Sequence, residues 1–151
     1  MWHVNFGDRL AAWNQLRTQS LTQPVDQTLA TINAWWFNTP WIPYHLHWDD
    51  KNAWPDPWQL LEDDLFCPLA RGLGILYTIA IINHPDIDSA VLTEVGGDNL
   101  VLIGKSKYIL NWDRDEIVNI NLGLQNPRRS VSLEQIQQQI EHNTPPNELS
   151  D

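Results

Sequence analysis

The only cysteine of the chain, Cys67, is the residue whose type and setting best suit covalent chemistry. Pro68 follows it and begins a mostly apolar run over residues 68–82, which predicts a buried helix. A thiol at a helix N-terminus lies near free backbone N–H groups and the positive end of the helix dipole, which stabilise a thiolate. The alternative is a small buried hydrophobic residue, because free cysteines are among the most buried residues.

A nucleophilic cysteine also needs a base, usually histidine, and a group that orients the base. His84 is the only histidine between the predicted helix and the region that follows it. A helix of about 15 residues is about 22 Å long, so we expect His84 and Cys67 at its opposite ends. His45 and His47 can reach Cys67 only if their segment folds over it, and the sequence leaves that path open.

The same two histidines begin a short cluster of metal-ligand residue types that continues with Asp49 and Asp50. In an extended segment, the side chains of His45 and His47 would point the same way, as two ligands of one metal must. However, several metal-binding residue types close together on one loop do not form a spacing that is specific to a metal site. We therefore expect no metal and no other cofactor.

Helices and strands that position Cys67 are indicated by apolar periodicity. Helices are predicted at residues 8–18 (capped by Asp8), 24–37, 57–66 (capped by Asp56), 68–82 and 133–141 (capped by Ser132, with Gln135 three residues later). Strands are predicted at 89–95, 99–103 and 107–112, with 116–120 as a fourth.

The expected fold class is α+β: N-terminal helices, a central buried helix and an antiparallel meander of three or four strands. Gly96-Gly97 supplies the turn of the first hairpin. The helix at 68–82 is apolar nearly all round, so it should form the centre of the core. We expect one domain over residues 1–142 and a polar tail over 143–151.

The order of these features resembles the transglutaminase-like cysteine peptidases, and most closely the bacterial transglutaminase-like cysteine proteinases. The resemblance covers roughly residues 54–113: Trp54-Pro55, an aromatic-rich helix, Cys67 opening an apolar helix, then a hairpin meander. In that family a strand reading His-Ala-Val-Leu supplies the base, and a later strand reading Val-Leu-Asp-Asn supplies the orienting acid. In this chain the corresponding segments read Ser89-Ala90-Val91-Leu92 and Ile109-Leu110-Asn111-Trp112.

The departures from the family pattern fall on its catalytic positions. Ser89 stands where the family has histidine, and Asn111 stands where it has aspartate. Serine has no group that titrates near neutral pH, so Ser89 cannot act as the base. The resemblance therefore implies a pseudoenzyme in which Cys67, Ser89 and Asn111 are a vestigial site. It also implies that Ser89 faces the start of the Cys67 helix, with Asn111 on the neighbouring part of the sheet.

Tryptophan is unusually abundant, with nine residues in the chain. Five of them are candidates for a protein-binding surface: Trp35, Trp36, Trp41, Trp48 and Trp54. The alternative is that most of them are core. Four prolines between residues 38 and 57 predict that this Trp-rich stretch is an ordered irregular loop. Sugar binding by exposed indole rings is a further alternative.

The net charge of −10 opposes binding to nucleic acid and to anionic membrane surfaces. The sequence has no apolar run long enough for a membrane span, so we expect a cytoplasmic protein with protein partners in a larger assembly. The chain also resembles compact, Trp-rich proteins of tailed-phage genomes, and this resemblance implies a virion component. The expected function is a non-catalytic structural or interaction subunit; the alternative is a thiol-dependent peptidase or amidase that uses Cys67 with an unidentified base.

Overall fold

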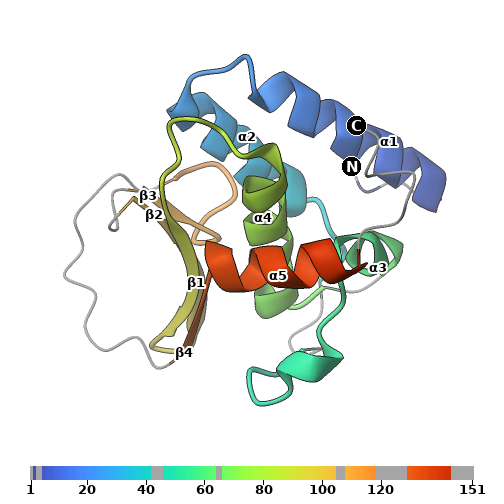
Figure 1. Cartoon of the computed structure of the whole chain (residues 1–151), viewed down its shortest axis with the longest axis vertical. Helices are drawn as coiled ribbons and strands as arrows, with labels where there is room; N and C mark the ends of the chain where they lie inside the picture. The colour runs from blue at the N-terminus through green and yellow to red at the C-terminus, as the bar shows by residue number, and fades with distance from the viewer. Residues whose placement is uncertain are drawn as a thin grey trace.

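The computed structural model describes residues 2, 5–41, 46–63, 66–104, 108–117 and 129–143. Across these residues the chain has the expected α+β fold (Figure 1). The helices are α1 (Phe6–Ser20), α2 (Val25–Trp36), α3 (Pro57–Glu62), α4 (Pro68–Ile82) and α5 (Leu133–Asn143), with a short 3-10 helix at Lys51–Ala53. The strands are β1 (Ala90–Val95), β2 (Asp98–Ile103), β3 (Tyr108–Leu110) and β4 (Arg129–Ser132).

The four strands form an antiparallel sheet in the order β3-β2-β1-β4. The first three strands are the predicted meander, and Gly96 and Gly97 turn the first hairpin with φ of 58° and 88°, which glycine adopts readily. The fourth strand is β4, which joins the opposite side of β1. The prediction of a strand at 116–120 was wrong for Glu116 and Ile117, which are irregular, and the rest of that segment lies outside the described residues.

Side-chain caps fix where several helices begin. Asp56 and Gln59 form a reciprocal capping box at α3, with nitrogen–oxygen distances of 2.8 and 3.0 Å. Ser132 and Gln135 make the same exchange at α5, as predicted. At α1 the cap is Asn5 rather than Asp8, because the Asn5 side chain accepts the backbone N–H of Asp8.

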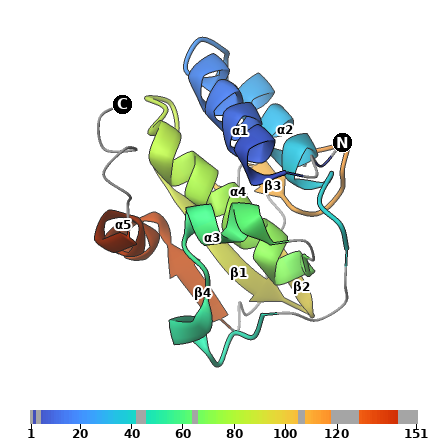
Figure 2. The ribbon, with the colours of Figure 1, turned by 90° about the vertical axis from the view of Figure 1, so that its right-hand side faces the viewer.

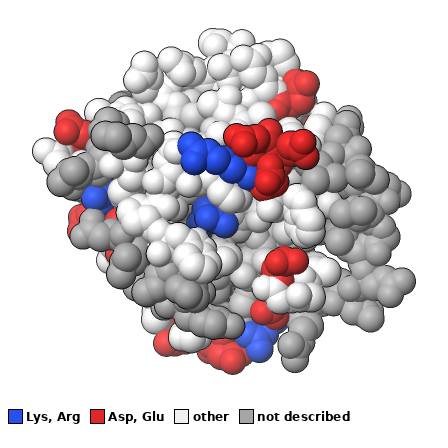
Figure 3. Space-filling model, turned by 180° about the vertical axis from the view of Figure 1, so that it is seen from behind, with Lys and Arg blue, Asp and Glu red and all other residues white. Residues whose placement is uncertain are grey.

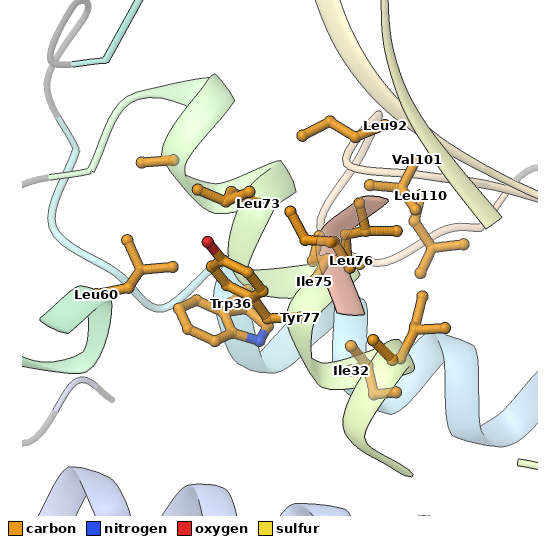
Figure 4. Packing of buried hydrophobic residues seen from close by; sticks show 14 of the residues in the cluster. Ile32, Trp36, Leu60, Leu73, Ile75, Leu76, Tyr77, Leu92, Val101 and Leu110 are labelled. Atoms are coloured by element: carbon orange, nitrogen blue, oxygen red, sulfur yellow. The ribbon is translucent and has the colours of Figure 1, made fainter. Parts of the chain in front are cut away.

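Helix α4 is the centre of the core, as its apolar sequence predicts. It lies between the sheet on one side and α1, α2 and α3 on the other (Figure 2). Leu73, Ile75 and Leu76 are completely buried between side chains of the sheet and of α2 and α3 (Figure 4). No helix in the described ranges, α4 included, has the length and apolar character needed to span a bilayer.

Helices α2 and α4 approach closely because Gly74 has no side chain. A Cβ atom at Gly74 would lie 2.6 Å from the ring of Trp36, which is itself 1% exposed. The indole N–H groups of Trp13 and Trp36 both donate to the hydroxyl of Thr78, at 2.9 and 3.0 Å. Thr78 donates in turn to the Gly74 carbonyl at 2.8 Å. One buried hydroxyl therefore joins α1, α2 and α4.

Tyr77 gives the fold a dependence on alkaline pH. Its hydroxyl donates to the Pro55 carbonyl at 2.6 Å, and burial, followed by the nearby Asp56 carboxylate, raises the pKa of Tyr77 well above its usual value. An unfolded chain loses this proton near the ordinary pKa of about 10, whereas the folded chain keeps it. The stability contributed by Tyr77 is therefore present below about pH 10 and is lost as the pH rises further.

We expect Tyr77→Phe to reduce this alkaline loss. Urea unfolding midpoints should fall less steeply between about pH 8 and about pH 11 in the variant than in the unmodified chain. The variant should be the less stable protein at pH 8, because the bond to Pro55 is gone. Parallel pH profiles for the two proteins would contradict this account of Tyr77.

Candidate functional site

A pocket of about 390 Å³ opens where α4 begins. Its walls come from four parts of the chain: the Trp-rich loop, the start of α4, the β1–β2 hairpin and β4. The lining residues with polar, reactive or exposed aromatic side chains include Trp41, His47, Cys67, Glu94, Asn99 and Arg129. The Trp-rich loop thus folds over Cys67, a path that the sequence left open.

Cys67 is the cap of α4 and forms part of the pocket wall. Its Sγ accepts the backbone N–H of Ala70 at 3.5 Å and that of Leu46, from the Trp-rich loop, at 3.4 Å. Only 2% of the residue is exposed. These two bonds hold the sulfur in place, and the burial of Cys67 leaves an incoming electrophile little access.

Ser89 does not lie near Cys67, contrary to the placement that the family resemblance implies. Strand β1 runs antiparallel to α4, so the residue preceding β1 lies beside the end of α4 and not its start (Figure 2). Ser89 is exposed, its carbonyl accepts the N–H of Gly104, and its hydroxyl contacts Asp88. Leu92 faces α4, since a Cβ at Gly72 would meet its Cδ1 at 2.7 Å.

The alternation of β1 therefore places Ser89 on the face of the sheet away from α4, together with Val91 and Thr93. Glu94 shares a face with Leu92 and lines the pocket. The end of β1 that approaches Cys67 thus carries a carboxylate. Histidine at position 89 could not supply a base to Cys67 in this arrangement.

Asn111 does lie at the start of α4, where its side chain and its backbone N–H together join α4, β2 and α2. Its amide nitrogen donates to the carbonyls of Pro68 (2.9 Å) and Asn99 (2.7 Å), and its backbone N–H donates to the side chain of Asn33 (2.8 Å). Its φ of 65° is left-handed, a conformation that asparagine tolerates better than most residues. These bonds assign Asn111 a structural role beside the pocket.

Arg71, which the sequence reading did not single out, is the fourth partner of Asn111. Its Nε donates to the Asn111 side-chain oxygen at 2.7 Å, and its guanidinium stacks on the ring of Phe37 at 3.8 Å. Burial lowers the pKa of Arg71, and the neighbouring Cys67 thiol acts in the opposite direction. The only sequence signal was its spacing, four residues after Cys67 and so on the same side of α4.

Most of the predicted binding tryptophans are core residues. Trp36, Trp48 and Trp54 are buried, and Trp35 is half-buried against Trp2 and Trp36. Their indole groups hold the loop in place: Trp48 donates to the Asn99 side chain at 2.8 Å, and Trp54 donates to the His47 carbonyl at 2.9 Å. Trp41 alone of the five is largely exposed, at 60%.

Charged groups surround the pocket. Arg129 of β4 lies 3.3 Å from Asp49 of the Trp-rich loop and 3.9 Å from Glu94 of β1, so an ion-pair network ties the loop to the sheet. Acidic side chains also gather in groups on the back of the molecule (Figure 3). No set of three or more His, Cys, Asp or Glu in the described ranges is arranged to hold a metal ion, and His45 lies outside those ranges.

Comparisons of the chain with protein-family models, with curated proteins and with solved structures find no match. A functional assignment therefore rests on the geometry described above.

Proposed function

We propose that this chain is a non-catalytic interaction or structural subunit of a larger protein assembly, such as a virion. The observation that carries the proposal is the state of Cys67, whose sulfur accepts one backbone N–H from α4 and one from the Trp-rich loop and which is only 2% exposed. A thiol used in this way stabilises a helix end and a loop. The position at which the resembled family carries its base, Ser89, lies at the other end of α4.

A second candidate function is a thiol-dependent peptidase or amidase. It is favoured by one observation, that the exposed His47 lines the same pocket as Cys67. In this candidate the base would come from the Trp-rich loop, whereas in the resembled family it comes from a strand. Reaction at Cys67 would then require the loop to move, because Leu46 donates to the sulfur and covers it.

Thiol labelling separates these two functions. We expect iodoacetamide to modify Cys67 in the folded protein at least ~10-fold more slowly than in the urea-unfolded chain at neutral pH, because attack requires local opening. Mass spectrometry at timed intervals gives both rates. Labelling of the folded protein as fast as, or faster than, the unfolded chain, with the speed lost in His47→Gln, would favour the enzyme.

Cys67→Ser tests the proposed role directly. Serine is also a good helix cap, so the fold should persist and the variant should assemble with the same partners as the unmodified chain. Purification from the native source, followed by mass spectrometry of the proteins that travel with each version, measures this. If Cys67→Ser keeps the fold and its partners but abolishes the biological activity, the non-catalytic proposal is wrong.

A further inference from the structure

Arg71 is a cation without a carboxylate partner in the described part of the chain. No Asp or Glu there forms an ion pair with it, although the chain carries 19 acidic residues. The Nε–H of Arg71 donates to Asn111, and neither of its Nη groups has a hydrogen-bond partner among the described residues. Since the residue is half-buried, water solvates its charge only in part. The lowered pKa of Arg71, caused mainly by burial, is consistent with a charge that lacks compensation.

The guanidinium of Arg71 is also held rigidly. The bond to Asn111 fixes one edge, and the ring of Phe37, 3.8 Å away, supports one face. Asn111 is fixed in turn by its bonds to Pro68, Asn99 and Asn33. A guanidinium oriented in advance loses little entropy when its two Nη groups bind a planar anion side by side.

Two exposed tryptophans neighbour, along the chain or by pairing, the segments that hold this cation. Trp112 follows Asn111 directly and is 58% exposed. Trp41 is 60% exposed and lies on the segment that pairs with Phe66, immediately before the start of α4. Tryptophan and arginine are, with tyrosine, enriched among the residues that dominate binding energy at protein interfaces.

We propose that Arg71, Trp41 and Trp112 form a docking surface for a partner polypeptide, on which Arg71 receives the carboxylate of an Asp or Glu side chain next to apolar residues. This inference rests on the interaction role proposed above and specifies its chemistry. A single guanidinium balances the single charge of a carboxylate, while the net charge of −10 opposes polyanions.

A side-chain carboxylate fits better than a chain terminus. Terminal carboxylates are commonly captured by nests of free backbone N–H groups. At the first turn of α4 two such groups are already used, since Ala70 donates to the sulfur of Cys67 and Arg71 donates to its carbonyl.

Peptide titration of the ¹⁵N-labelled full chain tests this surface. The probes are the capped tripeptides acetyl-Leu-Glu-Leu-amide and acetyl-Leu-Gln-Leu-amide, and acetyl-Leu-Gln-Leu with a free C-terminus. We expect the glutamate peptide to shift the Arg71 Nε–H and the Trp41 and Trp112 indole signals saturably. Its affinity should exceed that of the two glutamine peptides by roughly tenfold or more, which corresponds to about 1.4 kcal/mol.

Arg71→Gln tests the proposed surface, and Arg114→Gln, which removes the same charge, is its matched control. Arg71→Gln should weaken binding of the glutamate peptide by roughly tenfold or more, whereas Arg114→Gln should leave it within about twofold. Arg114 is exposed and donates to the Asn38 side chain, so it reports the effect of net charge alone. Thermal melts of both variants check that the fold is intact.

Three results would overturn the inference: no saturable shift with the glutamate peptide, equal binding of a glutamine peptide, or equal weakening by Arg114→Gln. Preference for the free C-terminus would exclude a side-chain ligand. The proposed function has a separate readout. If the same partners purify with Arg71→Gln as with the unmodified chain, Arg71 is not part of the docking surface, although the interaction role stands. If neither version retains a partner, the interaction role itself fails.

Discussion

Replacing Thr78 by valine is expected to lower the free energy of unfolding by about 2–6 kcal/mol. The substitution keeps the shape of the side chain but removes the acceptor of two buried indole N–H groups, those of Trp13 and Trp36. An unsatisfied buried donor costs about 1–3 kcal/mol, and no water reaches a residue that is 0% exposed in a tight core. Urea denaturation followed by circular dichroism measures the change.

Thr31→Val is the matched control for Thr78→Val. Its hydroxyl makes the same local bond, to the carbonyl four residues earlier, but on the exposed surface of α2. We expect a change within about 0.5 kcal/mol there, as for surface substitutions generally. Similar effects at positions 31 and 78 would show that the two indole bonds contribute nothing particular to stability.

Replacing Leu76 by alanine should cost about 2–5 kcal/mol, and Leu73→Ala should cost a similar amount. Both leucines are completely buried in α4, and each substitution removes contacts on a helix that the sheet and four other helices enclose. Leu21→Ala, at a residue that is 55% exposed, should be nearly neutral. A loss below about 1 kcal/mol at both buried positions would mean that α4 is not the centre of the core.

Local chemistry made much of this fold predictable. An apolar run such as 68–82 can be placed only in a core, and Pro68 marks where its helix begins. Gly96 and Gly97 specify a turn because each adopts a positive φ. The reciprocal cap of Ser132 and Gln135 acts over three residues, so sequence spacing alone reveals it.

The features that escaped prediction depend on contacts between distant segments. Strand β4 reads Arg-Ser-Val-Ser, which has too few apolar residues to predict a strand from the sequence. The segment is a strand because it pairs with β1. Period-two alternation groups Ser89 with Val91 and Thr93 but does not say which face of the sheet meets α4. The Trp-rich loop has no period at all, so neither its path over Cys67 nor the burial of Trp48 and Trp54 could be derived.

The strand order also determines when the sheet can be completed. The hairpin of β1 and β2 closes a short loop and can form early, whereas β4 must return from far along the chain to pair Leu92 with Val131. Closing a longer loop costs more entropy and delays such pairing. During synthesis on the ribosome, β1 therefore has an unpaired edge until residues 129–132 have emerged, and in that interval the nascent chain is most exposed to pairing with other strands.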